Sequence, residues 1–264
     1  MNIGIITGSG FYEFPDLQTE TIEKISTEFG DVEYRRAQRN GHQIFFIPRH
    51  GEGHQQLPNV INYRANIMAF KKLEVALIIS TSVMGILDQQ IPLASLLLFD
   101  DLFFVDNRLP GGETCTLYQK AGDSLRGHYL FDRPFSFKGL ECAQSAAKKL
   151  NISFTDHLTH AHSGGPRFNS KHEIAFFRKA ECHSISQTTG PEIVLAGEGE
   201  IAFILLGFSV DYANGIKENP TPVEVLNENL AASRSVFSTL ILEILDSIKG
   251  NENFFDNGFV YRFE

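Results

Sequence analysis

The chain has 264 residues and 42% hydrophobic content, which is ample for a buried core. Its 23 Lys and Arg against 32 Asp and Glu give a formal net charge of -9. This acidic balance argues against nucleic acid or an anionic membrane as the main partner, although it is compatible with a local cationic pocket.

The cysteines and the distribution of apolar residues indicate the cellular compartment of the protein. Cys115, Cys142 and Cys182 are widely spaced and predict neither a disulfide framework nor a structural zinc site. No stretch reaches about 18 uninterrupted apolar residues, and the start MNIGIITGSG has neither a basic segment nor a long apolar run. We therefore expect a soluble, cytoplasmic protein.

Short apolar runs recur along the chain and predict buried strands. They occupy residues 2–8, 42–48, 75–81, 93–105 and 203–210. Because these runs are apolar on both faces, they suit a sheet that helices cover on both sides.

Helical patterns lie between and after these runs. Residues 62–73 place apolar side chains on one face, and Ser170 and Glu173 have the spacing of a capping box that opens a second helix. Pro191 suits the first turn of a third helix. Residues 223–248 carry the longest apolar stripe near the helical period. Strands that alternate with helices predict an α/β layer architecture.

No linker or internal repeat divides the chain, so we expect a single domain over residues 1–264. The segment after Gly250 is unusually aromatic, with Phe254, Phe255, Phe259, Tyr261 and Phe263. A free aromatic tail would favour aggregation, so we expect these rings to pack onto the body of the protein or onto a neighbouring subunit.

Four segments at the expected strand ends carry residue types that bind anions. Gly8 and Gly10 flank Ser9 directly after the first strand, where closely spaced backbone N–H groups can hold an anion. The segment PRHGEGH contributes Arg49, a planar fork of donors, and His50. The segment STSVMG contributes Ser82, and SISQTTGPE contributes Thr188 before a helix N-terminus. The anion-binding candidates with a hydroxyl or a cationic group are therefore Ser9, Arg49, Ser82 and Thr188.

Each of these segments also has a structural interpretation. The glycines around Ser9 fit a plain turn, Arg49 can pair with Glu52 on a surface loop, and the hydroxyls can act as turn or helix caps. The joint occurrence of the four segments at strand ends is what favours a binding site.

The motifs IITGSGF, PRHGEGH, NYRANIMAFKKL, GGPRFNSKHEIAFFRK and TTGPEIVLAGEGEIAF occur in this order. Together they resemble the trimeric purine nucleoside phosphorylase family, in particular its 5'-methylthioadenosine phosphorylase branch. The resemblance covers about residues 3–248 and implies a central mixed β-sheet flanked by helices. It also implies cleavage of a purine nucleoside by inorganic phosphate, a co-substrate, without a cofactor or a metal.

The resemblance implies roles for individual residues. The phosphate-binding positions are Ser9, Arg49, His50, Ser82 and Thr188. The nucleoside-binding positions are Val83, Phe168, Asn169, Ser186, Gln187 and Asp211, together with His128 of a neighbouring subunit. We therefore expect a homotrimer whose sites are completed by His128.

Asp211 is the expected catalytic residue. As the glycosidic bond breaks, the base acquires negative charge, and an acid near N7 can stabilise it. A carboxylate can also accept from a 6-amino group, whereas the branch that uses 6-oxopurines tends to have asparagine. Asp211 therefore favours adenine nucleosides, with an exposed turn aspartate as the structural alternative.

Several positions depart from the branch that the chain resembles most. Ala213 occupies the place of a second aspartate, and Ser186-Gln187 replaces Asn-Met. Bulky residues Val83, Met84 and Ile86 follow the third strand, and Gly164-Gly165 stands where a glutamate precedes GPRF. These changes keep two alternatives open: a phosphorylase of 6-oxopurine nucleosides (inosine, guanosine or methylthioinosine), and a non-catalytic nucleoside-binding protein.

Two further motifs suggest other chemistry. His160 and His162 share one face of a strand, but no third metal ligand is evident. Cys182 lies beside His183, yet adjacent residues on a strand point to opposite faces. We expect no metal site and an inert thiol.

Overall fold

The computed structural model describes residues 1–8, 19–51, 53, 55–123 and 126–262. Its strands are β1 (Asn2–Thr7), β2 (Thr19–Thr27), β3 (Gly30–Arg39), β4 (His42–Pro48), β5 (Leu77–Ile86), β6 (Leu96–Phe103), β7 (His128–Phe131), β8 (Phe154–His162), β9 (Ser184–Ser186), β10 (Ala202–Tyr212) and β11 (Gly258–Tyr261). Its α-helices are α1 (Tyr63–Lys72), α2 (Phe137–Lys149), α3 (Lys171–Lys179), α4 (Thr189–Glu198) and α5 (Val223–Ser247).

The main sheet is mixed and has nine strands in the order β10-β6-β8-β9-β5-β1-β4-β3-β2. β5 also pairs with β10, so five strands (β5, β10, β6, β8 and β9) form a closed ring of pairings. The parallel pairings of β1 with β4 and of β5 with both β1 and β10 bring the carboxyl ends of these strands to one side. Loops at such strand ends line ligand crevices in α/β proteins.

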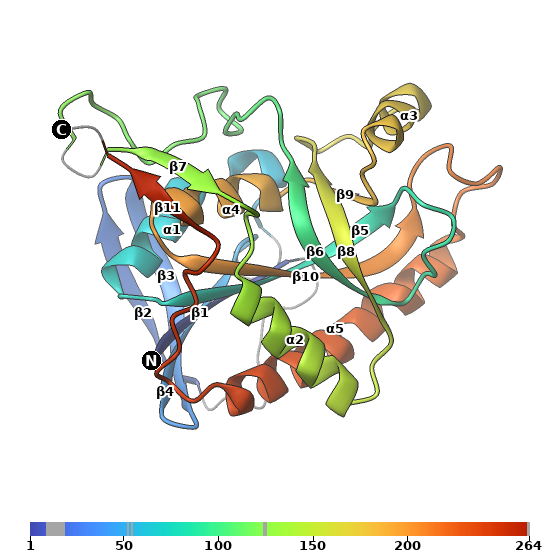
Figure 1. Ribbon diagram of the computed structural model, residues 1–264. Coiled ribbons are helices and arrows are strands. Elements are labelled where there is room, and N and C mark those ends of the chain that lie inside the picture. Colours follow the sequence, from blue (N-terminus) through green and yellow to red (C-terminus); the bar gives the residue numbers. More distant parts are fainter. Residues whose placement is uncertain (9–18, 52, 54, 124–125, 263–264) are drawn as a thin grey trace.

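Helices cover the sheet on both sides, as the apolar strands require. In Figure 1, α2 and α5 lie side by side below β10, whereas α1 and α4 lie above it. The long helix α5 contacts β10 and β5 from one side, and α4 contacts the same strands from the other. The expected α/β fold with a central mixed sheet is confirmed.

The elements predicted from apolar runs and helical patterns are present at nearly the expected positions. The Ser170 side chain accepts from the backbone N–H of Glu173, and the Glu173 side chain accepts from the backbone N–H of Ser170, so the capping box is confirmed. The side chain of Asn62 caps α1 by accepting from the backbone N–H of Ala65. Pro191 lies in the first turn of α4, and α5 ends at Ser247.

Other elements gave no apolar run in the sequence. Strand β3 has alternating burial and many charged residues, so its apolar face is only every second residue. Helix α2 begins at the Ser136 cap and buries small residues, mainly alanine and glycine, which produce a weak apolar pattern. These elements are positioned by tertiary packing rather than by local hydrophobicity.

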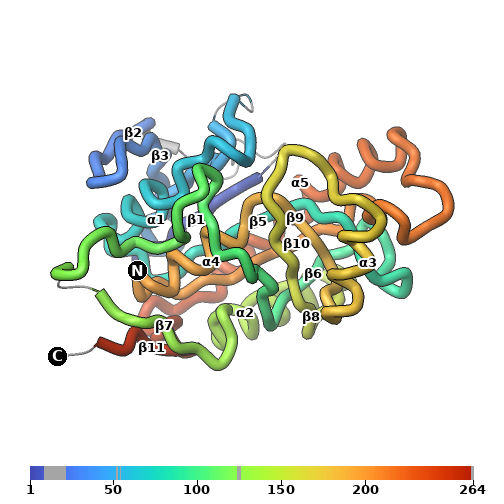
Figure 2. The backbone as a smooth tube through the Cα atoms, turned by 90° about the horizontal axis from the view of Figure 1, so that it is seen from above, coloured from blue at the N-terminus to red at the C-terminus, as the bar shows by residue number. Residues whose placement is uncertain are grey.

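The aromatic segment packs back onto the body, in part. Phe254 is buried, and β11 pairs antiparallel with β7 to form a separate two-stranded sheet. Phe259 and Tyr261 on β11 stay largely exposed. Figures 1 and 2 both show this small sheet at the opposite side of the molecule from α3.

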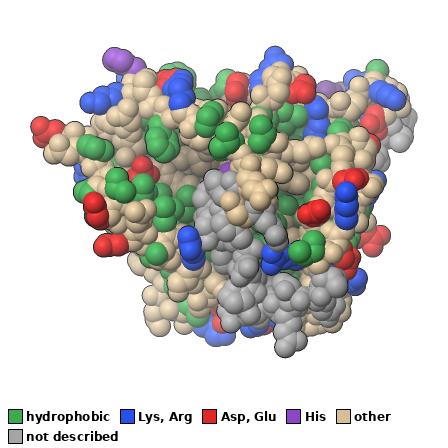
Figure 3. Space-filling model, turned by 180° about the vertical axis from the view of Figure 1, so that it is seen from behind, with side chains coloured by type: hydrophobic (Ala, Val, Ile, Leu, Met, Phe, Trp, Pro, Cys, Tyr) green, Lys and Arg blue, Asp and Glu red, His purple; other side chains and the backbone are tan. Residues whose placement is uncertain are grey.

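Figure 3 shows charged side chains of both signs around the margin of one face, with hydrophobic side chains gathered across its upper part. No helix in the described part of the chain combines the length and the hydropathy that a bilayer crossing requires.

Candidate functional site

A cavity of about 780 Å³ opens where strands β4, β5, β9 and β10 end. Ten of the expected site residues line it: Arg49, His50, Ser82, Val83, Phe168, Asn169, Ser186, Gln187, Thr188 and Asp211. They come from segments far apart in the sequence, and the fold brings them around one space. Ser9 lies outside the described residues, although its neighbour Gly8 lines the cavity.

At one end of the cavity, Arg49 forms a buried pair with Glu192 of α4. Arg49 Nε donates to Glu192 Oε1 at 2.6 Å and Nη2 donates to Oε2 at 2.9 Å. Each side chain is only 1% exposed. Of the five guanidinium N–H donors, four are engaged within the described residues, and the fourth bond is from Nη1 to the carbonyl of Thr81 at 2.8 Å. One N–H of Nη1 is therefore left for a ligand.

Gly8 lies against this guanidinium. A Cβ atom at Gly8 would stand 2.7 Å from Arg49 Nη1. Because Glu192 holds the guanidinium in place, the backbone at Gly8 can come close to the arginine only without a side chain. The glycine is thus explained by the close approach of the backbone to Arg49.

His50 lines the cavity, and a backbone carbonyl holds its ring. Its Nδ1 lies 2.7 Å from the carbonyl oxygen of Gln56, so Nδ1 carries the proton. This bond fixes the orientation of the His50 ring at the cavity.

Two hydroxyls border the cavity: that of Thr188, directly before α4, and that of Ser82 in β5. Thr188 is the residue before α4, but its side chain does not cap the helix, and its hydroxyl has no partner among the described residues. It is 6% exposed and lines the cavity. Ser82 Oγ makes only a local bond to the Val83 carbonyl at 3.1 Å. Both hydroxyls can therefore turn to a ligand, and the helix N-terminus favours an anion there.

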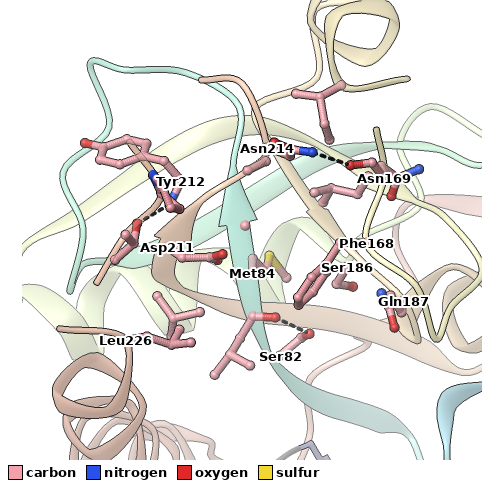
Figure 4. Close-up of a pocket in the computed structure, with 18 of the residues that line it drawn as sticks. Ser82, Met84, Phe168, Asn169, Ser186, Gln187, Asp211, Tyr212, Asn214 and Leu226 are labelled. Carbon is pink, nitrogen blue, oxygen red and sulfur yellow. Dashed lines mark hydrogen bonds between the residues drawn. The ribbon is translucent and has the colours of Figure 1, made fainter. Parts of the chain in front are cut away.

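At the other end of the cavity, a bulge in β10 directs Asp211. The register of β10 against β5 shifts between Ser209 and Asp211, so Val210 is an extra residue that has no partner on β5. Val210 and Asp211 both line the cavity, although consecutive strand residues would point to opposite faces. Figure 4 shows the carboxylate directed toward Met84.

Burial raises the pKa of Asp211 to about 6. No hydrogen bond to its carboxylate is found among the described residues, so desolvation acts on the group without compensation. An aspartate with this pKa exchanges a proton near neutral pH, which suits a general acid.

The opposite wall is formed by Phe168 and Asn169. Figure 4 shows the ring of Phe168 across the space from Asp211. Phe168 is 84% exposed, so a flat ligand that covered this ring would remove much apolar surface from water. Asn169 donates to Ser163 Oγ at 3.0 Å, and its carbonyl accepts from Asn214, which ties the two walls together.

Ser186 belongs to a buried relay of hydroxyls around His160. Burial lowers the pKa of His160 to about 3, so the ring is neutral. Its Nε2 lies 2.7 Å from Thr189 Oγ1, and Ser186 Oγ lies 3.1 Å from both atoms. When Ser186 Oγ donates to His160 Nε2 or to Thr189 Oγ1, its lone pairs are left to accept from a ligand hydroxyl in the cavity.

Gly165 and Gln187, two residues that depart from the methylthioadenosine phosphorylase motif, lie next to each other. A Cβ atom at Gly165 would stand within contact of Gln187 Oε1, and Gln187 Nε2 donates to the carbonyl of Arg167 at 3.1 Å. The absence of a side chain at Gly165 therefore makes room for Gln187. The bulky residues expected after the third strand lie within β5: Val83 and Met84 line the cavity, whereas Ile86 is buried in the core away from it.

His128 is exposed on β7 and is not among the residues that line the cavity of its own chain. Figure 2 shows β7 and β9 well apart. Contact between His128 and a site would therefore need a second subunit.

His160 and His162 are buried, and each ring has a hydrogen-bond partner in the described part of the chain. His162 Nδ1 accepts from the backbone N–H of Gly190 at 3.3 Å, and burial lowers its pKa to about 3. Within the described ranges, no group of three or more His, Cys, Asp or Glu could hold a metal ion. Burial raises the pKa of the Cys182 thiol to about 11, as in an inert thiol.

Several cavity residues were not predicted from the sequence. Glu192, which lies behind Arg49 and outside the cavity lining, was not predicted either; its signal was a glutamate inside the apolar run that follows Pro191. Lys171 and Lys217 line the cavity as well, and Lys217 Nζ lies 4.7 Å from the centre of the Tyr212 ring. Leu226 and Leu230 of α5 add an apolar wall. In the sequence they belong to the apolar stripe of residues 223–248, which predicts a helix and no ligand contact.

The model of the phosphorylase superfamily matches residues 2–246. The chain is 31% identical over 252 residues to "Probable 6-oxopurine nucleoside phosphorylase" of Dictyoglomus turgidum, with 92% of each chain covered. It is also 31% identical over 253 residues to "S-methyl-5'-thioadenosine phosphorylase" of Chloroflexus aurantiacus, covering 92% of this chain and 84% of that one.

Solved structures share the fold. A methylthioadenosine phosphorylase from Schistosoma mansoni in complex with adenine superposes with a TM-score of 0.85 at 22% identity, covering 95% of this chain and 92% of the other. A methylthioadenosine phosphorylase from an antarctic soil metagenomic library gives a TM-score of 0.83 at 25% identity, covering 94% and 86%.

Proposed function

The chain belongs to the phosphorylase superfamily, and from this premise we propose that it cleaves the N-glycosidic bond of a purine nucleoside with inorganic phosphate. The leading substrate is 5'-methylthioadenosine, which would give adenine and methylthioribose 1-phosphate. The observation that carries the purine assignment is Asp211, a cavity carboxyl whose pKa is raised to about 6.

Phosphate is proposed to bind at the Arg49 end. Arg49 Nη1, the hydroxyls of Ser82 and Thr188, and the backbone at Gly8 all border this part of the cavity. His50 lines the same end, where the bond from Nδ1 to the Gln56 carbonyl orients its ring, and it is proposed to contact the phosphate or a sugar hydroxyl. Ser9 is proposed as a further donor, on the resemblance alone.

The purine is proposed to lie between Phe168 and Asp211. In the protonated form, Asp211 would donate to N7 while the glycosidic bond breaks and charge moves onto the base. In the ionised form, it would accept from a 6-amino group. Val83, Asn169, Ser186 and Gln187 would complete the nucleoside site, with Ser186 accepting from a ribose hydroxyl.

The apolar wall is where a 5'-methylthio group would fit. Val210, Leu226 and Leu230 line the cavity near Asp211, and Figure 4 shows Leu226 below it. Burying one methylthio group against such side chains is favourable by about 1 to 2 kcal/mol. A free 5'-hydroxyl would forgo this gain.

A second candidate substrate class is the 6-oxopurine nucleosides. Ala213 lines the cavity where a second carboxylate would favour a 6-amino group, and a relative with 31% identity is named for 6-oxopurines. A protonated Asp211 can donate to N7 of either class. The preference therefore depends on the ionisation of Asp211 when the base is bound.

We also propose a homotrimer in which His128 of one subunit reaches the site of the next, because His128 lies away from its own cavity. The three free cysteines are compatible with a reducing compartment such as the cytoplasm. No cofactor is part of the proposed reaction, since phosphate is the nucleophile.

A panel of nucleosides tests the proposal. Methylthioadenosine, adenosine, inosine, guanosine and methylthioinosine are each incubated with and without phosphate, and the free base is measured. We expect release that requires phosphate and is fastest with methylthioadenosine. Binding without release across the whole panel would instead identify a non-catalytic nucleoside-binding protein.

A further inference from the structure

We propose that Glu192 is a positioning residue that neutralises Arg49 and so keeps the bound phosphate reactive. This inference rests on the proposed function, because it concerns the nucleophile of that reaction. Glu192 does not touch the cavity space: it is absent from the lining residues and is 1% exposed. It acts through Arg49.

The geometry of the pair leaves little freedom. Glu192 Oε1 accepts from Arg49 Nε, and Oε2 accepts from Arg49 Nη2 and from Ser80 Oγ at 2.9 Å. Ser80 Oγ in turn accepts from Arg49 Nη2 at 2.6 Å. This planar two-point contact turns the Nε and Nη2 edge of the guanidinium away from the cavity, so that only Nη1 is presented to a ligand.

The pair also changes the charge that an anion meets. Arg49 and Glu192 together carry no net charge, so the phosphate end is left with neutral hydroxyls, backbone N–H groups and the α4 N-terminus. Removing the charge of Glu192 would leave a buried, uncompensated guanidinium beside the phosphate. At such short range this charge would tighten phosphate binding by about tenfold or more.

Tighter binding of the nucleophile is not useful for catalysis. In the proposed reaction an oxygen of phosphate gives an electron pair to C1', while the pair of the C1'–N9 bond leaves with the purine. Phosphate therefore loses negative charge toward the transition state. An uncompensated Arg49 would stabilise bound phosphate in the ground state more than in the transition state, and kcat would fall.

The main test is Glu192→Gln, with Glu198→Gln as the matched control. Glu198 lies on the same helix, is half-buried, accepts hydrogen bonds from Thr116 and Leu117, and does not line the cavity. For Glu192→Gln we expect KM for phosphate and kcat each to fall about tenfold, while KM for the nucleoside changes less than about twofold. An unchanged or increased KM for phosphate would overturn the inference.

A double substitution covers the case in which Glu192→Gln does not fold. Arg49→Gln alone leaves the Glu192 charge beside the phosphate and should weaken phosphate binding strongly. Arg49→Gln/Glu192→Gln restores a neutral pair, and we expect it to bind phosphate at least about tenfold more tightly than Arg49→Gln. Equal affinities for the single and double variants would overturn the inference.

Calorimetric titration of inorganic phosphate without nucleoside separates this inference from the proposed function. If the wild-type protein binds no phosphate, both are overturned. If the wild type binds phosphate and Glu192→Gln differs from it no more than Glu198→Gln does, only the role of Glu192 is overturned. Tighter binding by Glu192→Gln supports the inference independently of turnover.

Discussion

Asn229 of α5 donates a hydrogen bond of 2.8 Å from Nδ2 to the carbonyl oxygen of Val210, the extra residue of the β10 bulge. Asn229 is buried, and the bulge carbonyl has no partner on β5. The bond therefore joins the first turns of α5 to the backbone immediately before Asp211. It stabilises the bulge that directs the carboxylate into the cavity.

Asn229→Ala should destabilise the fold by about 1 to 3 kcal/mol, because the Val210 carbonyl loses its partner. Since Asp211 follows directly, we also expect kcat to fall by about tenfold. Asn227→Ala, on the exposed face of the same helix, is the control. Chemical unfolding and steady-state kinetics check both effects; a kcat equal to that of Asn227→Ala would show that the bond does not position Asp211.

Asp211→Ala should lower kcat by about two to four powers of ten while leaving phosphate affinity within about twofold. The carboxyl lies at the end of the cavity proposed for the purine, whereas Arg49 and Thr188 border the end proposed for phosphate. Steady-state kinetics with both substrates varied measures the split. Loss of phosphate affinity equal to the loss of kcat would contradict the assignment of Asp211 to the base.

Asp211→Asn should shift the preference toward 6-oxopurines. An amide donates to N7 or to a 6-carbonyl, but it cannot supply a proton. We expect kcat/KM for methylthioadenosine to fall at least about tenfold relative to methylthioinosine. An unchanged ratio would mean that another residue recognises position 6, with Lys171, Lys217 and Glu218 as further charged residues in the cavity lining.

Asp211 also makes stability depend on pH. Its pKa is raised from 3.8 to about 6, so between these values the folded protein holds a proton that the unfolded chain has lost. The contribution of Asp211 to stability is therefore present at low pH and is lost as pH rises through about 6. The Asp211→Asn variant cannot ionise at this position, so its stability does not fall in this way as pH rises.

We accordingly expect Asp211→Asn to be more stable than wild type at pH 8 by on the order of 2 kcal/mol, with the difference vanishing near pH 4. Thermal unfolding of both proteins across this range measures it. A difference that stays constant with pH would show that the pKa of Asp211 is not raised.

Gly8→Ala should weaken phosphate binding by about tenfold, because the new methyl group would press on Arg49 Nη1, the donor that faces the ligand. Gly122→Ala is the control, since a Cβ there meets nothing within 4 Å. Isothermal titration with phosphate compares the two variants. Equal affinities would imply that Arg49 can move aside at no cost.

Much of the fold was predictable because the strands of the central sheet are apolar on both faces. The runs that became β1, β4, β5, β6 and β10 needed no tertiary information. Strand β3 and helix α2 were not predictable in this way, because their burial depends on neighbours that the local sequence does not specify.

The candidate site was predictable to a similar extent. Arg49 and Thr188 could be proposed from their residue types at strand ends, and the fold brings them to one cavity. Glu192 could not, because its role follows from a contact 143 positions away in sequence. The orientation of the His50 ring likewise depends on the Gln56 carbonyl, which no residue pattern reveals.

The most direct measurement is to follow phosphate itself during turnover by phosphorus NMR, with methylthioadenosine as the second substrate. We predict that inorganic phosphate is consumed in a one-to-one ratio with adenine released, and that a sugar 1-phosphate signal grows at the same rate. Release of adenine with no loss of inorganic phosphate would contradict phosphorolysis and identify a hydrolase. No release of base from any nucleoside of the panel would contradict catalysis altogether.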